Sequence, residues 1–450
     1  MAVSPKSPLS RRRLLREVAP GAAAMVAAAP FSFAGRRGPT AAGSDQVAAA
    51  RITARMETIA RFGATPAGGG SRTGGSDADL AARAAFAGWL EDAGLTVRID
   101  FAGNLIGRLE GSEPALPPLV SGSHLDSVPD GGNFDGVAGS IAALEAAEVF
   151  QSGAPLCHPL EVVVFFNEEN GKTGSRALAG EVTPEELDLP LHGGFSMGEA
   201  LARVGGSPER ITEAPLSPGD VAGYLELHIE QGPVLDTEGI EIGAVEGIVG
   251  IRRFRVTVSG FANHAGTTAM AIRRDALVTA GRFIAAVSDE TNRWPGRQVA
   301  TVGRIEAEPG AANVIPGEVE LSLEIRDLRM ETIDALYDHL RQAGSEIAAR
   351  NQTTMRFEPY YLSRAAPCDT AYVDLVAATA DDLGCSVARL PSGAGHDAQS
   401  MAPLAPIGMI FVPSRDGISH SPREFTPMED IVRGAQALTA ALRRLDGVAG

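Results

Sequence analysis

The sequence predicts an α/β protein with a smaller α+β domain inserted into it. The chain has 450 residues, and because domains usually contain about 100–200 residues, two domains are expected. Apolar runs of strand length alternate with helical periodicity up to about residue 249 and again after residue 362, which is typical of a parallel sheet with crossover helices. Between these regions the strands alternate polar and apolar residues, as in a sheet with one exposed face.

The elements of the first α/β region follow from apolar spacing and its interruptions. A helix is expected to begin after Ser76 and to end at Gly94, with Leu80, Ala84 and Leu90 at helical spacing. The next elements are strands at 97–99 and 105–109, a buried strand at 119–123, a helix at 137–150 and a strand at 161–166. Strand, helix and strand at this spacing predict a right-handed parallel crossover.

The middle of the chain is predicted to form the inserted domain. Its expected elements are a strand at 253–258, a helix at 274–288, strands at 300–307 and 318–326, and a helix at 331–349. We therefore expect the larger domain to comprise residues 45–249 and 362–450, and the inserted domain residues 250–361.

Residues 10–15 (SRRRLL) match the twin-arginine export pattern, and an alanine-rich stretch follows. We interpret residues 1–34 as a twin-arginine signal segment, which predicts a periplasmic or extracellular protein. The alternative is a flexible basic extension on a cytoplasmic protein. Beyond this segment no run of about 18–20 apolar residues occurs, so we expect no membrane anchor after processing.

The formal net charge of the chain is -17 at pH 7. Because such an acidic surface repels phosphate backbones, nucleic acid is not expected as a partner. Three cysteines are too few and too scattered for a disulfide framework, and they lack the close spacing of a zinc finger.

Candidate metal ligands lie in four polar, glycine-rich or carboxylate-rich motifs. The motifs supply five imidazole or carboxylate groups and no thiolate, namely His124, Asp135, Glu169, His228 and His420. This donor set suits Zn, Mn, Co or Ni.

Each motif taken alone has a plainer explanation. A single buried histidine is more often a packed core residue, and the pair Glu168 and Glu169 could be a solvated strand end. The motifs together favour a metal site because all four follow predicted strands or lie in loops, where open α/β sheets place their sites.

The same motifs resemble the amidase, hydantoinase and carbamoylase branch of the M20 di-metal amidohydrolases, which includes N-carbamoyl-L-amino acid hydrolases and allantoate amidohydrolases. The resemblance runs from about Arg72 to Glu424. It rests on residues 103–105 (GNL), 122–127 (GSHLDS), 135–136 (DG), 168–169 (EE), 227–233 (LHIEQGP), 263–268 (NHAGTT), 313–317 (NVIPG), 392–398 (SGAGHDA) and 419–420 (SH). It implies a mixed-sheet di-metal catalytic domain with helices on both faces and an inserted lid or dimerisation domain.

The resemblance also implies the metal ligands. Asp135 would bridge two divalent ions, zinc or else manganese, cobalt or nickel. Glu169 and His420 would hold one ion, and His124 and His228 the other.

Catalytic and substrate-binding residues are implied in the same way. Glu168 would be the general base, Asp126 would orient His124, and His264 would stabilise the oxyanion, in one arrangement from a partner subunit. The residues implied to hold the substrate's carboxylate and ureido groups are Gln231, Asn313 and Arg326.

Plainer alternatives exist for two of these residues. Arg326 could form an ion pair with Asp327 or another nearby acid, and Asn313 could be a turn residue before Pro316. We interpret His396 and Asp397 as structural residues that pack a glycine-rich loop under the site. A cis peptide bond is further implied between Asp135 and Gly136.

The implied activity is metal-dependent hydrolysis of a small ureido or carbamoyl acid, most simply an N-carbamoyl-L-amino acid, by a homodimer. Allantoate or another ureido acid is the first alternative substrate. An acyl-amino-acid or dipeptide hydrolase and a non-catalytic exported binding protein are the others.

Two departures from the family pattern bear on the substrate. Ala269 stands where the family usually has proline, and the loop after Glu169 is short and lacks the usual Arg-Phe pair. Because this loop lies beside the expected metal site, it affects the choice of substrate more than the chemistry.

Overall fold

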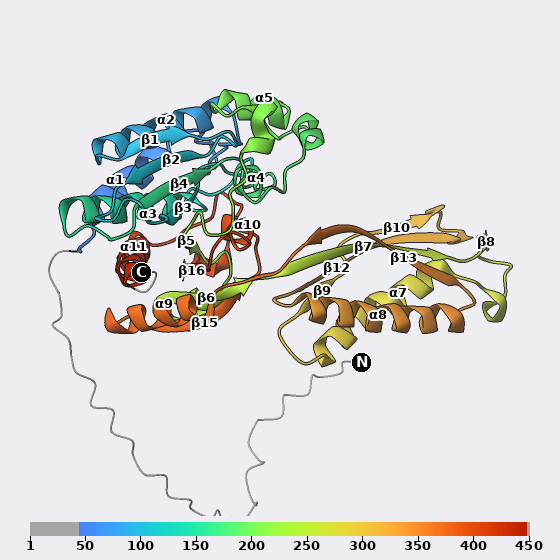
Figure 1. Cartoon of the computed structure of the whole chain (residues 1–450). Coiled ribbons are helices and arrows are strands. Elements are labelled where there is room, and N and C mark those ends of the chain that lie inside the picture. Colours follow the sequence, from blue (N-terminus) through green and yellow to red (C-terminus); the bar gives the residue numbers. More distant parts are fainter. Residues whose placement is uncertain (1–44, 448–450) are drawn as a thin grey trace, which may run out of the picture. The chain divides into compact units, whose positions relative to one another are not determined.

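Two separate large sheets organise the part of the chain that the computed structural model describes, residues 45–447 (Figure 1). The nine-stranded sheet has the order β1-β2-β4-β3-β5-β16-β6-β14, and β15 also pairs with β6. Its strands are β1 (Thr96–Ile99), β2 (Leu105–Leu109), β3 (Leu119–His124), β4 (Leu160–Phe165), β5 (Gly223–Ile229), β6 (Ile242–Ile248), β14 (Ala366–Pro367), β15 (Val387–Ser392) and β16 (Ile407–Val412).

The centre of this sheet is parallel and buried on both faces. Strands β4, β3, β5 and β16 pair in parallel, whereas β1, β2 and β14 join through antiparallel pairs, so the sheet is mixed. Every residue of β3, β4, β5 and β16 is buried, as expected for strands covered by helices on both sides. The parallel pairing of β3 with β4 confirms that this connection is a parallel crossover.

Helices cover both faces of the nine-stranded sheet. Helices α3 and α11 pack on β3, β5 and β16 from one side, and Figure 1 shows α10 on the other side of β5 and β16. The helices of this domain are α1 (Ala49–Ile59), α2 (Asp77–Asp92), α3 (Val137–Ser152), α4 (Thr173–Leu178), α5 (Met197–Arg203), α6 (Val234–Glu238), α9 (Thr370–Asp382), α10 (Asp397–Met401) and α11 (Met428–Asp446).

A five-stranded antiparallel sheet with two helices forms the smaller domain. Its strands are β7 (Gly250–Ser259), β9 (Val299–Thr301), β10 (Ile305–Glu308), β12 (Glu318–Asp327) and β13 (Thr354–Ser363), and its helices are α7 (Ala276–Arg293) and α8 (Met330–Arg350). Both helices place apolar side chains at helical spacing against one face of the sheet, which gives this domain a core of its own. A short pair, β8 (Asn263–His264) with β11 (Val314–Ile315), lies beside it.

Two elements of the smaller domain differ from the prediction. The single strand expected at 300–307 is split into β9 and β10, because the Ser322 hydroxyl accepts a hydrogen bond from the Gly303 amide and interrupts the ladder. Strand β13 was not predicted. Its register shifts between Pro359 and Tyr361, and a proline within a strand obscures the alternating pattern.

The predicted fold class is confirmed: an α/β domain on a mixed sheet, with helices on both faces, and a smaller α+β domain whose strands β7 to β13 come between β6 and β14 in the chain. The predicted domain bounds stay a prediction. The twin-arginine interpretation concerns residues 1–34, which lie outside the described residues. Within residues 45–447, no helix is both long and apolar enough to cross a membrane.

Candidate metal centre

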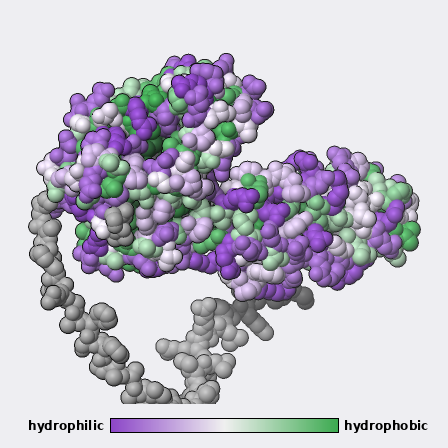
Figure 2. Space-filling view, viewed as in Figure 1, coloured by the Kyte–Doolittle hydropathy of each residue, from purple (hydrophilic) through white to green (hydrophobic). Residues whose placement is uncertain are grey.

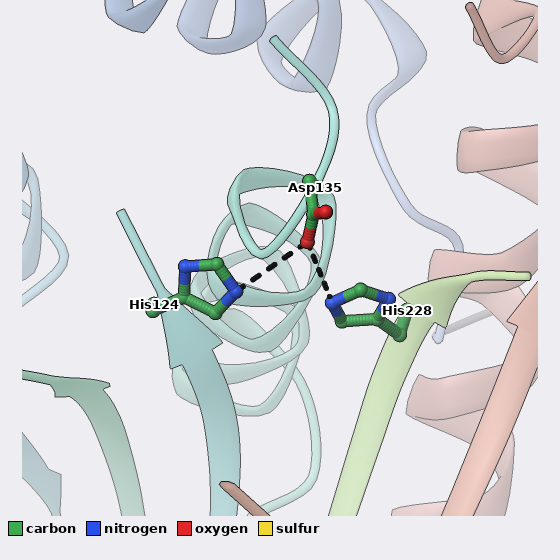
Figure 3. Close-up of side chains that lie close together, drawn as sticks. All are labelled: His124, Asp135 and His228. Atoms are coloured by element: carbon green, nitrogen blue, oxygen red, sulfur yellow. Dashed lines mark ion pairs between the residues drawn. The ribbon is translucent and has the colours of Figure 1, made fainter. Parts of the chain in front are cut away.

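Two histidines face one carboxylate oxygen at the ends of neighbouring parallel strands. His124 ends β3 and His228 is the penultimate residue of β5. The register pairs Ser121 with Leu225, and the same offset continued along the strands places His124 opposite His228. Asp135 Oδ1 lies 3.5 Å from His124 Nε2 and 3.1 Å from His228 Nε2 (Figure 3).

The other nitrogen of each imidazole faces a backbone carbonyl. His124 Nδ1 lies 3.0 Å from the carbonyl oxygen of Asp126, and His228 Nδ1 lies 2.8 Å from that of Ile229. If each Nδ1 donates its proton there, the lone pair of each Nε2 faces the carboxylate of Asp135. Two acceptors that face each other need a proton or a cation between them. Metal-binding histidines are typically oriented by a hydrogen bond from the ring nitrogen that does not bind the metal, as the Nδ1–carbonyl bonds would do here.

The second oxygen of Asp135 faces another cluster. His420 Nε2 lies 3.3 Å from Asp135 Oδ2 and 3.2 Å from Glu169 Oε2. Glu169 directly follows the end of β4, and His420 lies in the loop between β16 and α11. One carboxylate therefore joins two groups of nitrogen and oxygen donors that come from four separate parts of the chain.

The donor set fits divalent metal ions. Ligand atoms about 2.0–2.1 Å from a tetrahedral ion lie about 3.3–3.4 Å from one another, and the histidine-to-carboxylate distances in the two clusters are 3.1–3.5 Å. Both groups, His124 with Asp135 and His228, and Asp135 with Glu169 and His420, have their ligand atoms within 4.8 Å of one another.

The electrostatics of the centre favour the presence of positive charge between its carboxylates. Burial raises the pKa of Asp135, but hydrogen bonds with His124, His228 and His420 outweigh burial and hold this pKa well below its usual range. Hydrogen bonds to Asp135 and Glu169 raise the pKa of His420 to about 11. Without an ion, imidazolium protons therefore supply the positive charge that the carboxylates require.

Glu168 and Asp126 lie beside the clusters. Glu168 Oε2 is 3.9 Å from His124 Nε2, and burial raises the pKa of the Glu168 carboxyl well above its ordinary value. The Asp126 carboxylate accepts hydrogen bonds from the backbone amides of Glu168 at 3.2 Å and Glu169 at 3.1 Å. Asp126 thus contacts His124 more closely through its carbonyl oxygen than through its carboxylate, which is 3.7 Å away.

Three further residues hold the Asp135 turn. The Glu424 carboxylate accepts hydrogen bonds from the backbone amides of Phe134 and Asp135 and from the Ser419 hydroxyl. Gln231, predicted to bind substrate, donates from Nε2 to Asp135 Oδ2 at 2.6 Å. The roles of Glu424 and Ser419 were not predicted, although both lie in or next to the 419–420 motif.

His396 and Asp397 lie under the site. The His396 ring packs edge-on against the His228 ring with centroids 4.4 Å apart, and its Nε2 lies 2.7 Å from the Ser392 hydroxyl. Asp397 accepts a hydrogen bond from the Ser175 hydroxyl. This geometry agrees with a packing role, although Glu226, His228 and His396 also form a third group of potential ligands.

Three predicted site residues lie in the smaller domain or beside it. His264 and Asn313 are exposed, and the Asn313 carbonyl accepts a hydrogen bond from the Ala265 amide next to the β8–β11 pair. Arg326, on β12, pairs with Glu324 and not with Asp327, and it donates from Nη1 to the Gly393 carbonyl. Within residues 45–447, none of these three side chains bonds to the five candidate ligands.

The expected cis peptide bond after Asp135 is not present. Among residues 45–447 the cis bond precedes Pro309. Gly136 instead has φ 64° and ψ -45°, a conformation that glycine adopts readily. A methyl group built on Gly136 would lie 2.5 Å from ring atoms of His124, so glycine is also required for the close approach of this turn to the imidazole.

Comparisons with known proteins agree on the family. Residues 120–444 match the model of peptidase family M20/M25/M40. The chain is 40% identical to an N-carbamoyl-L-amino acid amidohydrolase of Geobacillus stearothermophilus, over 86% of this chain and 96% of the relative. It is 34% identical to an allantoate amidohydrolase of Bacillus subtilis, over 88% and 97%.

A solved structure supports the same assignment. The crystal structure of an amidase of the hydantoinase/carbamoylase family from Burkholderia multivorans matches with a TM-score of 0.82 at 35% identity, over 90% of this chain and 99% of that one. With the family model matched over most of the chain, and with relatives aligned over nearly their full length, the protein belongs to peptidase family M20/M25/M40.

Proposed function

We propose that the protein is an amidohydrolase that cleaves a linear ureido C–N bond. The favoured reaction converts an N-carbamoyl-L-amino acid and water into the L-amino acid, carbon dioxide and ammonia. The observation that carries this proposal is the position of Asp135, whose two oxygens each face a separate ligand cluster. The 40% identity to a relative named for this reaction supports the substrate class.

Divalent metal binding suits both the family and the clusters. In our proposal, His124 and His228 would hold one ion, Glu169 and His420 would hold the second, and Asp135 would offer an oxygen to each. Zinc is the first expectation, with manganese, cobalt or nickel as alternatives. When bound, such ions polarise the scissile carbonyl and lower the pKa of water toward neutrality.

Glu168 is the proposed general base. Its carboxylate lies at the edge of the His124 cluster, 3.9 Å from His124 Nε2, where it would take a proton from the attacking water and give it to the leaving nitrogen. The bonds from the Glu168 and Glu169 amides to Asp126 fix the main chain of this pair. Asp126 thereby positions the base and one ligand, in addition to holding His124.

The remaining predicted residues would bind the substrate and its transition state. The guanidinium of Arg326 is suited to a carboxylate because its planar fork donates two parallel hydrogen bonds. We propose that Asn313 and Gln231 assist in holding the substrate and that His264 donates to the developing oxyanion. Such a donor is worth roughly 3–4 kcal/mol in known cases.

We further propose a homodimer formed through the smaller domain. Phe261, Met270 and Ile272 are 55%, 75% and 68% exposed, and Figure 2 shows hydrophobic residues gathered at the end of the smaller domain that Figure 1 marks with β8. The backbone bond between the Phe261 amide and the Arg274 carbonyl closes this loop around His264. An exposed apolar surface is suited to contact with a partner subunit. Contact next to His264 would let this histidine reach the partner's site.

Allantoate is the second candidate substrate. Relatives named allantoate amidohydrolase are 34% identical over 88% of the chain, and the same centre would serve that reaction. An acyl-amino-acid or dipeptide hydrolase and a non-catalytic binding protein are weaker candidates, because the chain retains Glu168 and His264 together with the ligand set.

A substrate panel tests the proposal. Purified protein, loaded in turn with zinc, manganese, cobalt or nickel, would be given N-carbamoyl-L-amino acids, their D enantiomers, allantoate and N-acetyl-L-amino acids, and ammonia and free amino acid would be measured. We expect equal amounts of ammonia and L-amino acid from the L-carbamoyl compounds. Absence of ammonia from every ureido acid with all four metals would refute the proposal.

A further inference from the structure

Lys172 occupies the short loop between the Glu168–Glu169 pair and α4, which is the loop that departs from the family pattern. It adopts a left-handed conformation with φ 53°, and its amide donates to the Glu168 carbonyl at 2.8 Å. This geometry turns the lysine side chain toward α10, where Nζ donates a hydrogen bond to Gln399 Oε1. The ammonium is thus held by a neutral amide and not by a carboxylate.

A cavity of about 600 Å³ lies beside this lysine. Its lining includes three cations, Lys172, Arg176 and Arg364, and two carboxylates, Glu181 and Glu186. Arg176 is neutralised because it pairs with Glu186 at 2.8 Å and Glu181 at 3.9 Å. Among residues 45–447, no carboxylate lies within ion-pair distance of Lys172 or Arg364, although Glu168, Asp397 and Glu181 are near enough to act on the Lys172 ammonium electrostatically. Because Arg176 engages both carboxylates of the lining, Lys172 and Arg364 are the cations of this cavity that are open to an anionic ligand.

The glycine-rich loop 392–397, which does not itself line the cavity, lies next to both Lys172 and the candidate ligand His228. The Gly393 carbonyl accepts from Arg326, and a methyl group built on Gly395 would lie 3.3 Å from Lys172 Nζ. The next residue, His396, packs against His228. Gly393 and Gly395 are two residues apart, and two residues span at most about 7 Å of chain. Arg326 and the ammonium of Lys172 therefore approach the loop at points no farther apart than the length of a small substrate.

We propose that this cavity receives the acidic side chain of a ureido dicarboxylic acid, whose second carboxylate binds Lys172 and Arg364. The inference rests on the proposed function and specifies its substrate class. Lys172 is half-buried and Arg364 is exposed, and a substrate carboxylate would give both cations a directly bonded anion. A cavity of this volume is in the usual range for small-molecule sites.

A competing role for Lys172 is to adjust the neighbouring general base. The two roles differ in what they change. A lysine that acts through Glu168 alters kcat for every substrate, whereas a lysine that binds the second carboxylate alters KM for acidic substrates only. Neutral isosteres of the acidic substrates separate these effects.

The experiment compares N-carbamoyl-L-glutamate with N-carbamoyl-L-glutamine, and N-carbamoyl-L-aspartate with N-carbamoyl-L-asparagine, on the metal-loaded full-length enzyme. We expect the wild type to have the higher kcat/KM for the acid of each pair. In Lys172→Met, which retains most of the aliphatic stem, the acid-to-amide ratio of kcat/KM should fall at least tenfold, through KM. Lys172→Arg should keep most of the ratio, and Arg364→Ala should lower it less than Lys172→Met.

Arg293→Ala is the matched control, because Arg293 is an exposed cation of α7 outside the cavity. It should leave the ratio unchanged. An unchanged ratio in both Lys172→Met and Arg364→Ala, an equal fall in kcat on acids and amides, or a wild type that prefers the amides would overturn this inference and leave the proposed function standing. Absence of activity toward every ureido acid would overturn both this inference and the proposed function.

Discussion

The carboxylates of Glu168 and Glu169 are adjacent in the chain but face different histidines. Glu168 Oε2 lies 3.9 Å from His124 Nε2, and Glu169 Oε2 lies 3.2 Å from His420 Nε2. The Asp126 carboxylate fixes this divergence by accepting hydrogen bonds from both backbone amides. Two chemically identical side chains can therefore have separate roles, one in proton transfer and one in metal binding.

Exchange of each glutamate for glutamine should separate the two roles. Glu168→Gln removes the proposed base but no ligand, so kcat should fall by about 10²- to 10⁴-fold with metal content unchanged. Glu169→Gln should lose metal. Turnover and metal per chain, the latter by elemental analysis, are measured on the same preparations. A fully active Glu168→Gln would show that the base lies elsewhere.

Metal stoichiometry should distinguish the two clusters. The wild type is expected to hold two ions per chain, and His228→Ala and His420→Ala should each hold one. Asp135→Asn should hold fewer ions than either histidine variant, because Asp135 contacts both clusters. His339→Ala is the control, since His339 pairs with Glu290 in the smaller domain. A wild type that binds no transition ion after exposure to all four metals would contradict the assignment.

Metal affinity should rise with pH. In the metal-free centre the pKa of His420 is raised to about 11, first by its hydrogen bond to Asp135 and then by that to Glu169, so at neutral pH this imidazole carries a proton that an ion must displace. Each displaced proton adds about one unit to the slope of log affinity against pH. Calorimetry in two buffers of different ionisation enthalpy measures the release. An affinity independent of pH between about 6 and 9 would be inconsistent with these protonated imidazoles.

Arg326→Lys should raise KM about tenfold or more with a smaller effect on kcat, because a lysine lacks the planar fork and charged hydrogen bonds contribute about 1.5–3 kcal/mol. Arg253→Lys is the matched control, since Arg253 Nε also pairs with Glu324, at 2.6 Å. Steady-state kinetics on one carbamoyl substrate compares the two. Equal KM values in both variants would mean that Arg326 serves only the ion pair with Glu324.

Ile272→Asp should convert the proposed dimer into a monomer, because it places a charge in the exposed apolar loop around His264. Light scattering coupled to size exclusion measures the mass. Leu189→Asp is the control, a 50% exposed apolar residue of the larger domain. If Ile272→Asp has the same mass as the wild type, the interface lies elsewhere.

Part of the site was predictable because its ligands follow predicted strands. His124 and Glu169 come at the ends of apolar runs, and the parallel pairing of buried strands brings such ends to one edge of a sheet. The ion pair of Arg326 was also within reach of the sequence. Residues two apart on a strand share a face, so Glu324 is its natural partner, whereas Asp327 points to the other face.

Other features had no local signal. Glu424 bonds to the amide of Asp135, which lies 289 residues earlier in the chain, and periodicity carries no information about such a pair. Strand β13 contains Pro359 at a register shift, so its alternation is broken. The side-chain bond from Ser322 that divides β9 from β10 is likewise a tertiary effect.

The bond between Glu424 and the Asp135 turn has a consequence for biosynthesis. Asp135 and Glu424 lie far apart in the chain, so the ribosome makes them at different times. N-terminal parts begin to fold first, during synthesis at about 5–20 residues per second. In a nascent chain, the proposed metal site is therefore incomplete until the last tens of residues emerge. If the proposed ions bind there, metal acquisition is a late step, and chains that end before Glu424 should hold less metal.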